Sequence, residues 1–496
     1  MDDNSVNENK NQLIDESQSI STESSEKQPT DTNQPILEVE EISPEVSSPE
    51  EEKIGELTTP PPEQPIFIEN KSKYFIIGAA VAIFLILLIF FLKILSKKTP
   101  KKTIKLVYWG LWEEKTVFEP LIKLYQQKNP HITIDYQKME PQDYRDRLLI
   151  RSQKGTGPDL FRFHNTWLPQ IKDILTKIPN NIISNSEFEK TFYPIHQRDL
   201  KIGNYYYGIP LEIDGLILIS NQDLLKQAGI ANPPTNWDEM LDAVSKLTVK
   251  DSSGQIITAG VAIGTANNIE HFSEIFGLFL VQNGIDLTKL DQPEAADVLE
   301  AYRKFAEPPN DFWNESMPNS IVAFIQEKVA MIITPSWWIN NIKAANPDIK
   351  IKAVPVPAIP GGKNLSIANY WVEGVSRYSQ NQIEAWKFLK FLSEKENLTK
   401  IYELEQKTRT VGEPYSRIDL ANLLVNDPYL GPVIKQANDF VSLPLITRTF
   451  DNGINDEIVY YIENAINMAT QGTEYKTAIE SLKKGVDQTY EKYKIK

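Results

Sequence analysis

The chain of 496 residues contains no cysteine. This absence excludes disulfide bonds, zinc sites built on thiolates and catalysis by a cysteine nucleophile. It also excludes the acylated cysteine that tethers many exported proteins, so attachment to a membrane would need another device. Histidine is scarce, with four residues, and the G-x-S-x-G, H-E-x-x-H and Walker A patterns are absent. We therefore expect no catalytic residues, no metal and no cofactor.

A concentrated basic surface is also lacking. The net charge of -15 arises in residues 1–70, which hold 18 acidic and 3 basic side chains, whereas the other 49 basic and 49 acidic residues cancel. Nucleic acid is therefore excluded as a partner, because binding to phosphates needs clustered positive charge. Residues 1–70 are rich in Ser, Glu, Asn, Gln and Pro, which predicts a disordered acidic tail. Its role is either solubilising or specific docking.

An uninterrupted apolar run follows this tail at residues 74–92. As a helix, its 19 residues span about 28 Å, close to the ~30 Å hydrocarbon thickness of a bilayer. This pattern predicts a transmembrane anchor over residues 71–98. The alternative is a cleaved signal peptide, but a signal peptide has a shorter apolar core and a small-residue cleavage site. Here the run ends in KILSKK at residues 93–98.

The sequence gives conflicting indications of the orientation of this anchor. Lysines are denser after the run than before it, which taken alone would place the large domain in the cytoplasm. Long domains, however, translocate largely regardless of charge. We expect a single-pass protein of the cell membrane, with the tail in the cytoplasm and residues 103–496 extracytoplasmic.

From residue 104 onward, strand-like and helix-like segments alternate. Residues 104–109 form an apolar run, and Phe118, Leu121, Ile122 and Tyr125 share one helical face that ends before Asn129 and Pro130. Alternating apolar residues at 132–136 and a further run at 159–163 predict two more strands. The order βαβαβ is typical of an α/β lobe with a parallel sheet. We find no internal repeat, so the domain is globular and not a solenoid.

An ordered series of short motifs carries a resemblance to a known family. The motifs are GTGPDL (155–160), YGIP (207–210), NQDLL (221–225), PPTNWDE (233–239), VAMII (329–333) and EAWKFL (384–389). Over about residues 103–496, the chain resembles the bacterial extracellular solute-binding protein family 1, which contains maltose-binding protein. Most of these motif residues have structural explanations: Asn236 and Glu239 are spaced as a capping box, and Trp386 lies in a core stripe.

The resemblance implies a two-lobed periplasmic-binding-protein fold of type II, the Venus-flytrap form, with the solute between its lobes. It implies a first lobe of about residues 103–215 and 357–408, and a second lobe of about 216–356 and 409–496. It also implies an extracytoplasmic carbohydrate receptor of an ABC importer, with a mono- or oligosaccharide and the permease subunits as partners.

A sugar receptor needs aromatic platforms beside fixed polar groups, because sugars combine apolar ring faces with hydroxyls. All nine tryptophans lie after residue 103, and several follow strands, where open α/β sheets place ligands. The expected ligand-binding residues, by position and resemblance, are Trp112, Glu113, Asn165, Trp167, Asp214, Asn267, Trp337, Trp338, Trp371 and Glu373. Alternatives stay open for several of them. Asp214 is either a sugar ligand or a hydrogen-bonded hinge acid, with Glu212 as a competitor, and one of Trp337 and Trp338 packs.

Two other functions fit parts of the sequence. Paired carboxylates and aromatics also suit an anchored glycoside hydrolase, although the carboxylates here are scattered through a binding-protein pattern. A solute sensor or scaffold without transport is the other alternative. Binding with turnover would favour the hydrolase.

Overall fold

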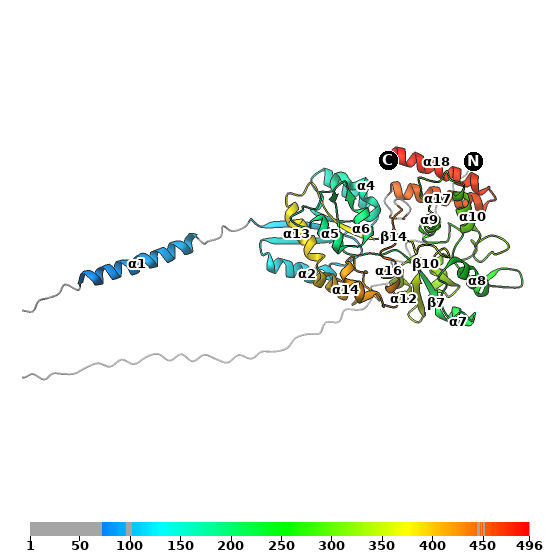
Figure 1. Ribbon diagram of the computed structural model, residues 1–496, viewed down its shortest axis with the longest axis horizontal. Helices are drawn as coiled ribbons and strands as arrows, with labels where there is room; N and C mark the ends of the chain where they lie inside the picture. The colour runs from blue at the N-terminus through cyan, green and yellow to red at the C-terminus, as the bar shows by residue number, and fades with distance from the viewer. Residues whose placement is uncertain (1–71, 96–101, 444–446, 448, 450–451, 496) are drawn as a thin grey trace, which may run out of the picture. The chain divides into compact units, whose positions relative to one another are not determined.

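The computed structural model describes residues 72–95, 102–443, 447, 449 and 452–495 (Figure 1). The chain divides into two compact units, residues 1–96 and 97–496. The predicted acidic tail, residues 1–70, lies outside the described residues.

The first unit contributes one helix, α1 (Ser72–Leu95), which contains the predicted apolar run. Its described side chains, at residues 75–90, are exposed. Within the part of the chain that the structure describes, no helix is long and apolar enough to cross a membrane. The helical conformation of the run is confirmed, and its role as an anchor stays a prediction.

The second unit begins with a five-stranded mixed sheet in the order β2-β1-β3-β13-β6, which we take as the centre of lobe 1. Its strands are β1 (Ile104–Gly110), β2 (Ile132–Lys138), β3 (Leu160–His164), β6 (Ile209–Pro210) and β13 (Trp371–Val375). Strand β1 is parallel to β2 and β3, whereas β13 is antiparallel to β3 and β6. The predicted βαβαβ order is confirmed. The late strand β13 brings Trp371 beside His164.

A second five-stranded sheet, in the order β11-β7-β10-β9-β8, forms the centre of lobe 2. Its strands are β7 (Leu216–Asn221), β8 (Val249–Lys250), β9 (Ile256–Val261), β10 (Val329–Pro335) and β11 (Ile351–Pro355). Every residue of β7 and β10 is buried, which explains why these strands read as continuous apolar runs and not as alternating patterns. The chain is therefore a two-lobed α/β protein.

Helices cover both sheets (Figure 1). On lobe 1 lie α2 (Lys115–Lys128), α3 (Tyr144–Gln153), α4 (Leu168–Ile171), α5 (Asn185–Thr191), α6 (Pro194–Asp199), α13 (Gln382–Leu392) and α14 (Lys395–Glu405). On lobe 2 lie α7 (Gln222–Gln227), α8 (Trp237–Leu247), α9 (Phe272–Gln282), α10 (Glu294–Arg303), α11 (Ser320–Ile325), α12 (Trp338–Ala345), α16 (Gly431–Gln436), α17 (Ile454–Thr470) and α18 (Tyr475–Tyr493). Short elements complete the fold: β4 (Lys201–Ile202), β5 (Tyr205–Tyr206), β12 (Ser366–Ile367), β14 (Phe440–Val441) and α15 (Ala421–Leu424).

Local sequence explains where these helices begin and which face they bury. The side chain of Asn236 accepts a hydrogen bond from the Glu239 backbone N–H at 2.9 Å, so the predicted cap of α8 is confirmed. The Glu239 carboxylate reaches back and accepts from the Thr235 N–H and hydroxyl, each at 2.8 Å. Trp386 is fully buried, as its position in the predicted core stripe of α13 requires.

The segments that join the two lobes pair with one another. Gly215 forms an antiparallel bridge with Ala368. The Ile213 N–H donates to the Pro414 carbonyl at 2.9 Å, and the Asn369 N–H donates to the Asp214 carbonyl at 2.8 Å. Three crossings therefore lie side by side at the base of the space between the lobes. The residues at which one lobe gives way to the other stay a prediction.

Gly215 allows this close pairing, and its replacement by alanine should destabilise the fold. A Cβ at Gly215 would lie 2.4 Å from the Ile367 carbonyl oxygen and 2.6 Å from the Phe440 ring, so the crossings would have to separate. We expect Gly215→Ala to lower the free energy of unfolding by about 1–3 kcal/mol, measured by denaturant titration of the full chain. The exposed loop change Ser252→Ala is the control. Equal midpoints for Gly215→Ala and the wild type would contradict this account.

Candidate functional site

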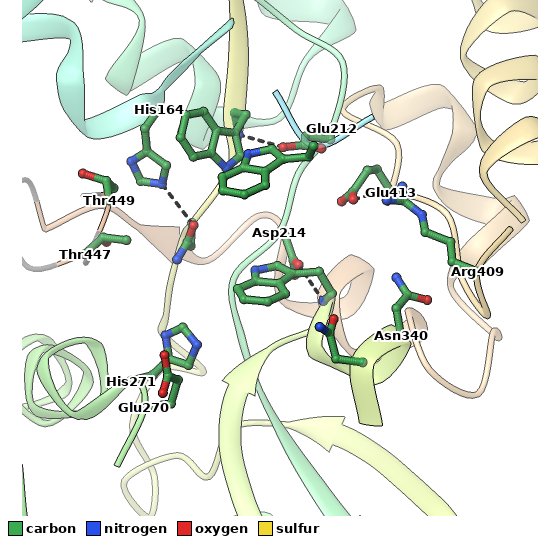
Figure 2. Close-up of a pocket in the computed structure, with 15 residues that line it drawn as sticks. His164, Glu212, Asp214, Glu270, His271, Asn340, Arg409, Glu413, Thr447 and Thr449 are labelled. Atoms are coloured by element: carbon green, nitrogen blue, oxygen red, sulfur yellow. Dashed lines mark hydrogen bonds and ion pairs between the residues drawn. The ribbon is translucent and has the colours of Figure 1, made fainter. Parts of the chain in front are cut away.

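A cleft of about 400 Å³ lies where the crossings meet both lobes (Figure 2). Its walls combine indole rings with carboxylates, amides and threonine hydroxyls. The lining residues are Trp112, His164, Glu212, Asp214, Glu270, His271, Trp337, Asn340, Asn341, Asn369, Trp371, Arg409, Glu413, Thr447 and Thr449. This composition offers apolar faces and hydrogen-bonding groups together, which suits a polar solute with apolar surface.

Lobe 1 contributes an aromatic wall to the cleft. Trp112 follows β1, and Trp371 begins β13, with their ring centroids 5.5 Å apart. Trp112 has a φ of 66°, a left-handed conformation that bulky residues rarely adopt, and its side chain is 43% exposed. Trp167 is buried behind this wall, 5.3 Å from the Trp371 ring, and its Nε1–H donates to Thr449 Oγ1 at 2.9 Å. Trp371 is thus held from behind while Trp112 faces the cleft.

Lobe 2 contributes a second aromatic face, at the turn between β10 and α12. The Trp337 ring stacks on the Trp338 ring with a centroid distance of 4.7 Å. The Trp338 Nε1–H donates to His271 Nε2 at 2.7 Å. Because an indole nitrogen can only donate, His271 Nε2 must be the acceptor, and its Nδ1–H then points at Glu274 Oε1, 3.1 Å away. Glu274 and His271 therefore hold Trp338, and Trp338 supports the Trp337 platform.

On the lobe 1 side of the cleft, His164 orients the amide of Asn369 in a similar way. His164 Nδ1 accepts from the Thr166 backbone N–H at 3.4 Å, so its Nε2–H is the group that meets Asn369 Oδ1, at 3.0 Å. This hydrogen bond orients the Asn369 amide and uses one lone pair of its oxygen. The Asn369 amide N–H groups are left as the donors that a solute in the cleft can use.

Asp214 lies at the first crossing with its carboxylate fully hydrogen-bonded. It accepts from the Gly215 N–H at 2.7 Å, the Ser336 N–H at 3.2 Å, the Ser336 hydroxyl at 3.0 Å and the Trp337 N–H at 3.2 Å. Burial and the nearby Glu413 raise the pKa of Asp214 to about 7, against the lowering effect of these donors. The structure therefore supports the hinge-acid alternative, since four donors occupy the carboxylate's acceptor sites.

An ion-pair network lies beneath the aromatic wall of lobe 1. Arg162 on β3 is buried and pairs with Glu113, and its Nε–H donates to Glu373 Oε1 at 2.6 Å. Burial works against the charge of Arg162, but the two carboxylates raise its pKa, so the guanidinium stays ionised. Glu113 follows Trp112 directly, and Glu373 follows Trp371 by two residues on the same strand. The network therefore anchors both tryptophans of the wall.

A second arginine, Arg409, extends this ion-pair network to the edge of the cleft. Arg409 pairs with Glu405 and with Glu413, each at 3.0 Å, and lies 3.6 Å from Glu113. Glu212 accepts from the Trp371 N–H at 2.8 Å. Burial and the neighbouring Glu413 raise its pKa well above the ordinary value. Glu212 therefore holds its proton more tightly than it would in water.

The structure brings only part of the predicted set into the cleft. Trp112, Asp214, Trp337 and Trp371 line it, and Trp338 lies directly behind Trp337. The other predicted ligands lie outside the lining and have protein partners: Glu113 and Glu373 with Arg162, Asn165 with Asp199 and Ser442, Trp167 with Thr449, and Asn267 with Glu315 and Asn467. Each of these side chains meets a partner distant in sequence, and its role as a ligand stays a prediction.

Several lining residues were absent from the predicted set. They are His164, Glu270, His271, Asn340, Asn341, Asn369, Arg409, Glu413, Thr447 and Thr449, whereas Glu212 was the predicted competitor of Asp214. A signal existed for two of them: Asn340 lies one helical turn after Trp337, and Asn369 lies two residues before Trp371. No local pattern marks His271, whose partner Trp338 is 67 residues away. Within the described ranges, no group of three His, Cys, Asp or Glu residues could hold a metal ion.

Comparisons with known proteins support the two-lobed fold of a solute-binding protein. The profile of a family described as bacterial extracellular solute-binding protein matches residues 121–411. A proposed binding protein of Brucella abortus is 26% identical over 288 residues, covering 56% of this chain and 69% of that protein. The multiple sugar-binding protein of Streptococcus mutans is 21% identical over 308 residues, covering 59% and 71%. The fold matches a cyclo/maltodextrin-binding protein complexed with maltotetraose, with a TM-score of 0.64, 20% identity and coverage of 79% and 99%.

The buried carboxylate of Glu405 should make stability depend on pH. Burial, with Glu413 and Glu113 nearby, raises the pKa of Glu405 from 4.5 to about 8, although Arg409 opposes this. Between these values the folded chain keeps a proton that the unfolded chain has released. The free energy of unfolding should therefore fall as pH rises through this range, on the order of a few kcal/mol.

Glu405→Gln should remove this part of the fall, as measured by urea unfolding of the full chain across the same pH range. Glutamine keeps an oxygen that can accept from the Glu413 N–H. The control is Glu403→Gln on the exposed face of α14, which should leave the pH profile unchanged. An undiminished fall in Glu405→Gln would assign the proton to another group.

Proposed function

Because the chain belongs to the bacterial extracellular solute-binding proteins, a family of binding proteins and not of enzymes, we propose that it is the carbohydrate receptor of an ABC importer. Its lobes close on a sugar and present it to the permease. The observation that carries this proposal is the pair of opposed aromatic faces, Trp112 with Trp371 and Trp337 with Trp338, around one polar cleft.

The chemistry of the cleft fits a sugar. Indole rings pack against the apolar C–H faces of a sugar ring, while Asn340, Asn341 and the Asn369 amide can bond its hydroxyls. The solved structure that resembles this chain holds maltotetraose, and a relative is named for sugar binding. These likenesses favour a mono- or oligosaccharide over other polar solutes.

The cleft carboxylates favour binding over cleavage. A retaining or inverting hydrolase needs one carboxyl as a proton donor and a second as a nucleophile or base. Four protein donors occupy Asp214, and Arg409 pairs with Glu413. Glu212 accepts from the Trp371 N–H, so Glu270 is the lining carboxylate that the described residues leave open to a solute, and hydrolysis needs two. Hydrolase activity and sensing without transport are therefore not part of the proposal, and the experiments below can detect them.

Closure on the solute supplies the signal to the permease. To shift an open-to-closed equilibrium from 1:99 to 99:1, the solute must bind the closed form better by ~5.5 kcal/mol. Hydrogen bonds at ~1 kcal/mol each and the burial of stacked rings at ~25 cal/mol per Å² can supply this difference. The contacts must come from both lobes, which is how the aromatic faces are distributed.

The apolar run of α1 supports a further part of the proposal, a single-pass anchor over residues 71–98. With no cysteine for acylation, this run is the feature of the sequence that suits a membrane. The acidic tail would then lie in the cytoplasm and residues 103–496 outside the cell. The lysines after the run oppose this orientation, but a long domain translocates largely regardless of charge. Tethering would keep the receptor near its permease.

Alanine at the two platforms should weaken sugar binding strongly and leave the fold intact. Trp112→Ala and Trp337→Ala each remove one stacking face, for which we expect a loss of at least ~30-fold in affinity, about 2 kcal/mol. The measurement is a sugar array followed by calorimetry, with turnover assayed in parallel. Tyr460→Ala, an exposed aromatic on α17, is the control. If no sugar binds, the carbohydrate assignment is wrong. If a sugar is turned over, the receptor proposal is wrong.

Surface digestion of intact cells tests the orientation. An added protease should degrade residues 103–496 and spare an epitope placed in the tail. In permeabilised cells both should be lost. If residues 103–496 are protected in intact cells, the importer proposal fails. Recovery of the chain in the soluble fraction would instead refute the anchor.

A further inference from the structure

Acidic groups dominate the cleft. Its described lining residues include four carboxylates, Glu212, Asp214, Glu270 and Glu413, and one guanidinium, Arg409. That guanidinium is already shared between Glu405 and Glu413. The imidazole of His271 accepts from Trp338 at Nε2, so it contributes no positive charge in this arrangement. Two of the four carboxylates hold protons near neutral pH, because burial and the nearby Glu413 raise the pKa of Asp214 to about 7 and that of Glu212 well above its ordinary value. Glu413 is paired with Arg409, so the place for a positive charge is at the remaining carboxylate, Glu270.

Glu270 differs from the other three carboxylates. Asp214 is saturated by four donors, Glu413 pairs with Arg409, and Glu212 accepts from the Trp371 N–H. Glu270 accepts one hydrogen bond, at Oε2, from the Asn319 amide at 2.9 Å. Among the residues that the structure describes, no Lys, Arg or His lies within ion-pair distance of it. Its charge is half-buried and unbalanced.

The surroundings of Glu270 also favour a cation. Figure 2 shows Glu270 beside His271, on the other side of the cleft from Arg409 and Glu413. The His271 ring lies 6.0 Å from the Trp337 ring, which places the aromatic platform near this carboxylate. The face of an indole carries negative potential and attracts ammonium groups. A carboxylate without a cation and an indole face together match an ammonium group attached to a ring that stacks.

We propose that the solute is an amino sugar, or an oligomer of one, whose ammonium group pairs with Glu270 while its ring stacks on Trp337. The proposal rests on the carbohydrate function above and narrows it to a positively charged sugar. A neutral sugar would leave the Glu270 charge uncompensated after the lobes close and exclude water, which costs binding free energy.

Matched oligosaccharides can test the ammonium group directly. The probes are a glucosamine oligomer, its N-acetylated counterpart and a neutral glucose oligomer of the same length. Calorimetry uses the full chain in a detergent without a sugar headgroup, at about pH 6, at which an amine is protonated. We expect the glucosamine oligomer to bind at least ~tenfold more tightly than either neutral probe. Added salt should reduce this preference.

The variant Glu270→Gln removes the charge but keeps an oxygen for the Asn319 amide. It should erase the preference for the amine by weakening binding of the glucosamine oligomer, while the neutral probes bind as tightly as before or more tightly, because the uncompensated charge is gone and the uncharged hydrogen bonds are retained. The control is Glu300→Gln, an exposed glutamate of the same lobe on α10.

The outcomes separate this proposal from the general one. Equal binding of all three probes, or a preference that survives in Glu270→Gln, overturns the amino-sugar proposal and leaves the carbohydrate receptor standing. Binding of no probe, together with no response on the sugar array, overturns the carbohydrate function itself. Preference for the amine that disappears in Glu270→Gln but not in Glu300→Gln supports both.

Discussion

The carboxylate of Asp214 joins the hinge of this protein to its binding surface. Two of its hydrogen bonds reach backbone N–H groups of Ser336 and Trp337, which precede α12 and have no partner within that helix. Another holds Gly215, where the chain crosses between the lobes. One buried acid therefore ties the crossing to the turn that presents Trp337. In the proposed closure, movement at this crossing would therefore shift Trp337 as well.

In lobe 1, ion pairs fix the position of the aromatic wall. Arg162 stands between Glu113 and Glu373, and each of these acids lies next to a tryptophan of the wall in sequence or on the same strand face. Removing a single partner would leave a buried charge uncompensated, which is far more costly than losing a surface pair. The ion pairs thus set where Trp112 and Trp371 stand. The left-handed backbone of Trp112 is tolerated because the residues after it are held.

The sequence predicted the fold better than the site, for a physical reason. Strand β1 and helix α2 follow from local periodicity, which depends on neighbours a few residues apart. The predicted ligands Glu113 and Glu373 have suitable chemistry and lie close to the cleft, but the arginine that claims them is 49 and 211 residues away. Periodicity carries no information on such pairings. For Trp337 and Trp338 the sequence predicted one stacking and one packing residue, but it could not show that the distant His271 binds Trp338.

The distribution of the lining residues determines which contacts can drive closure. Trp112 and Trp371 belong to lobe 1, whereas Glu270 and Trp337 belong to lobe 2. Contacts with the first lobe to meet the solute exist in both the open and the closed form, so they raise affinity without shifting the equilibrium. Only contacts with the second lobe are specific to the closed form. If the protein is the importer receptor proposed above, a solute that lacks a group for one wall would bind without closing it, and transport would discriminate among solutes more sharply than binding does.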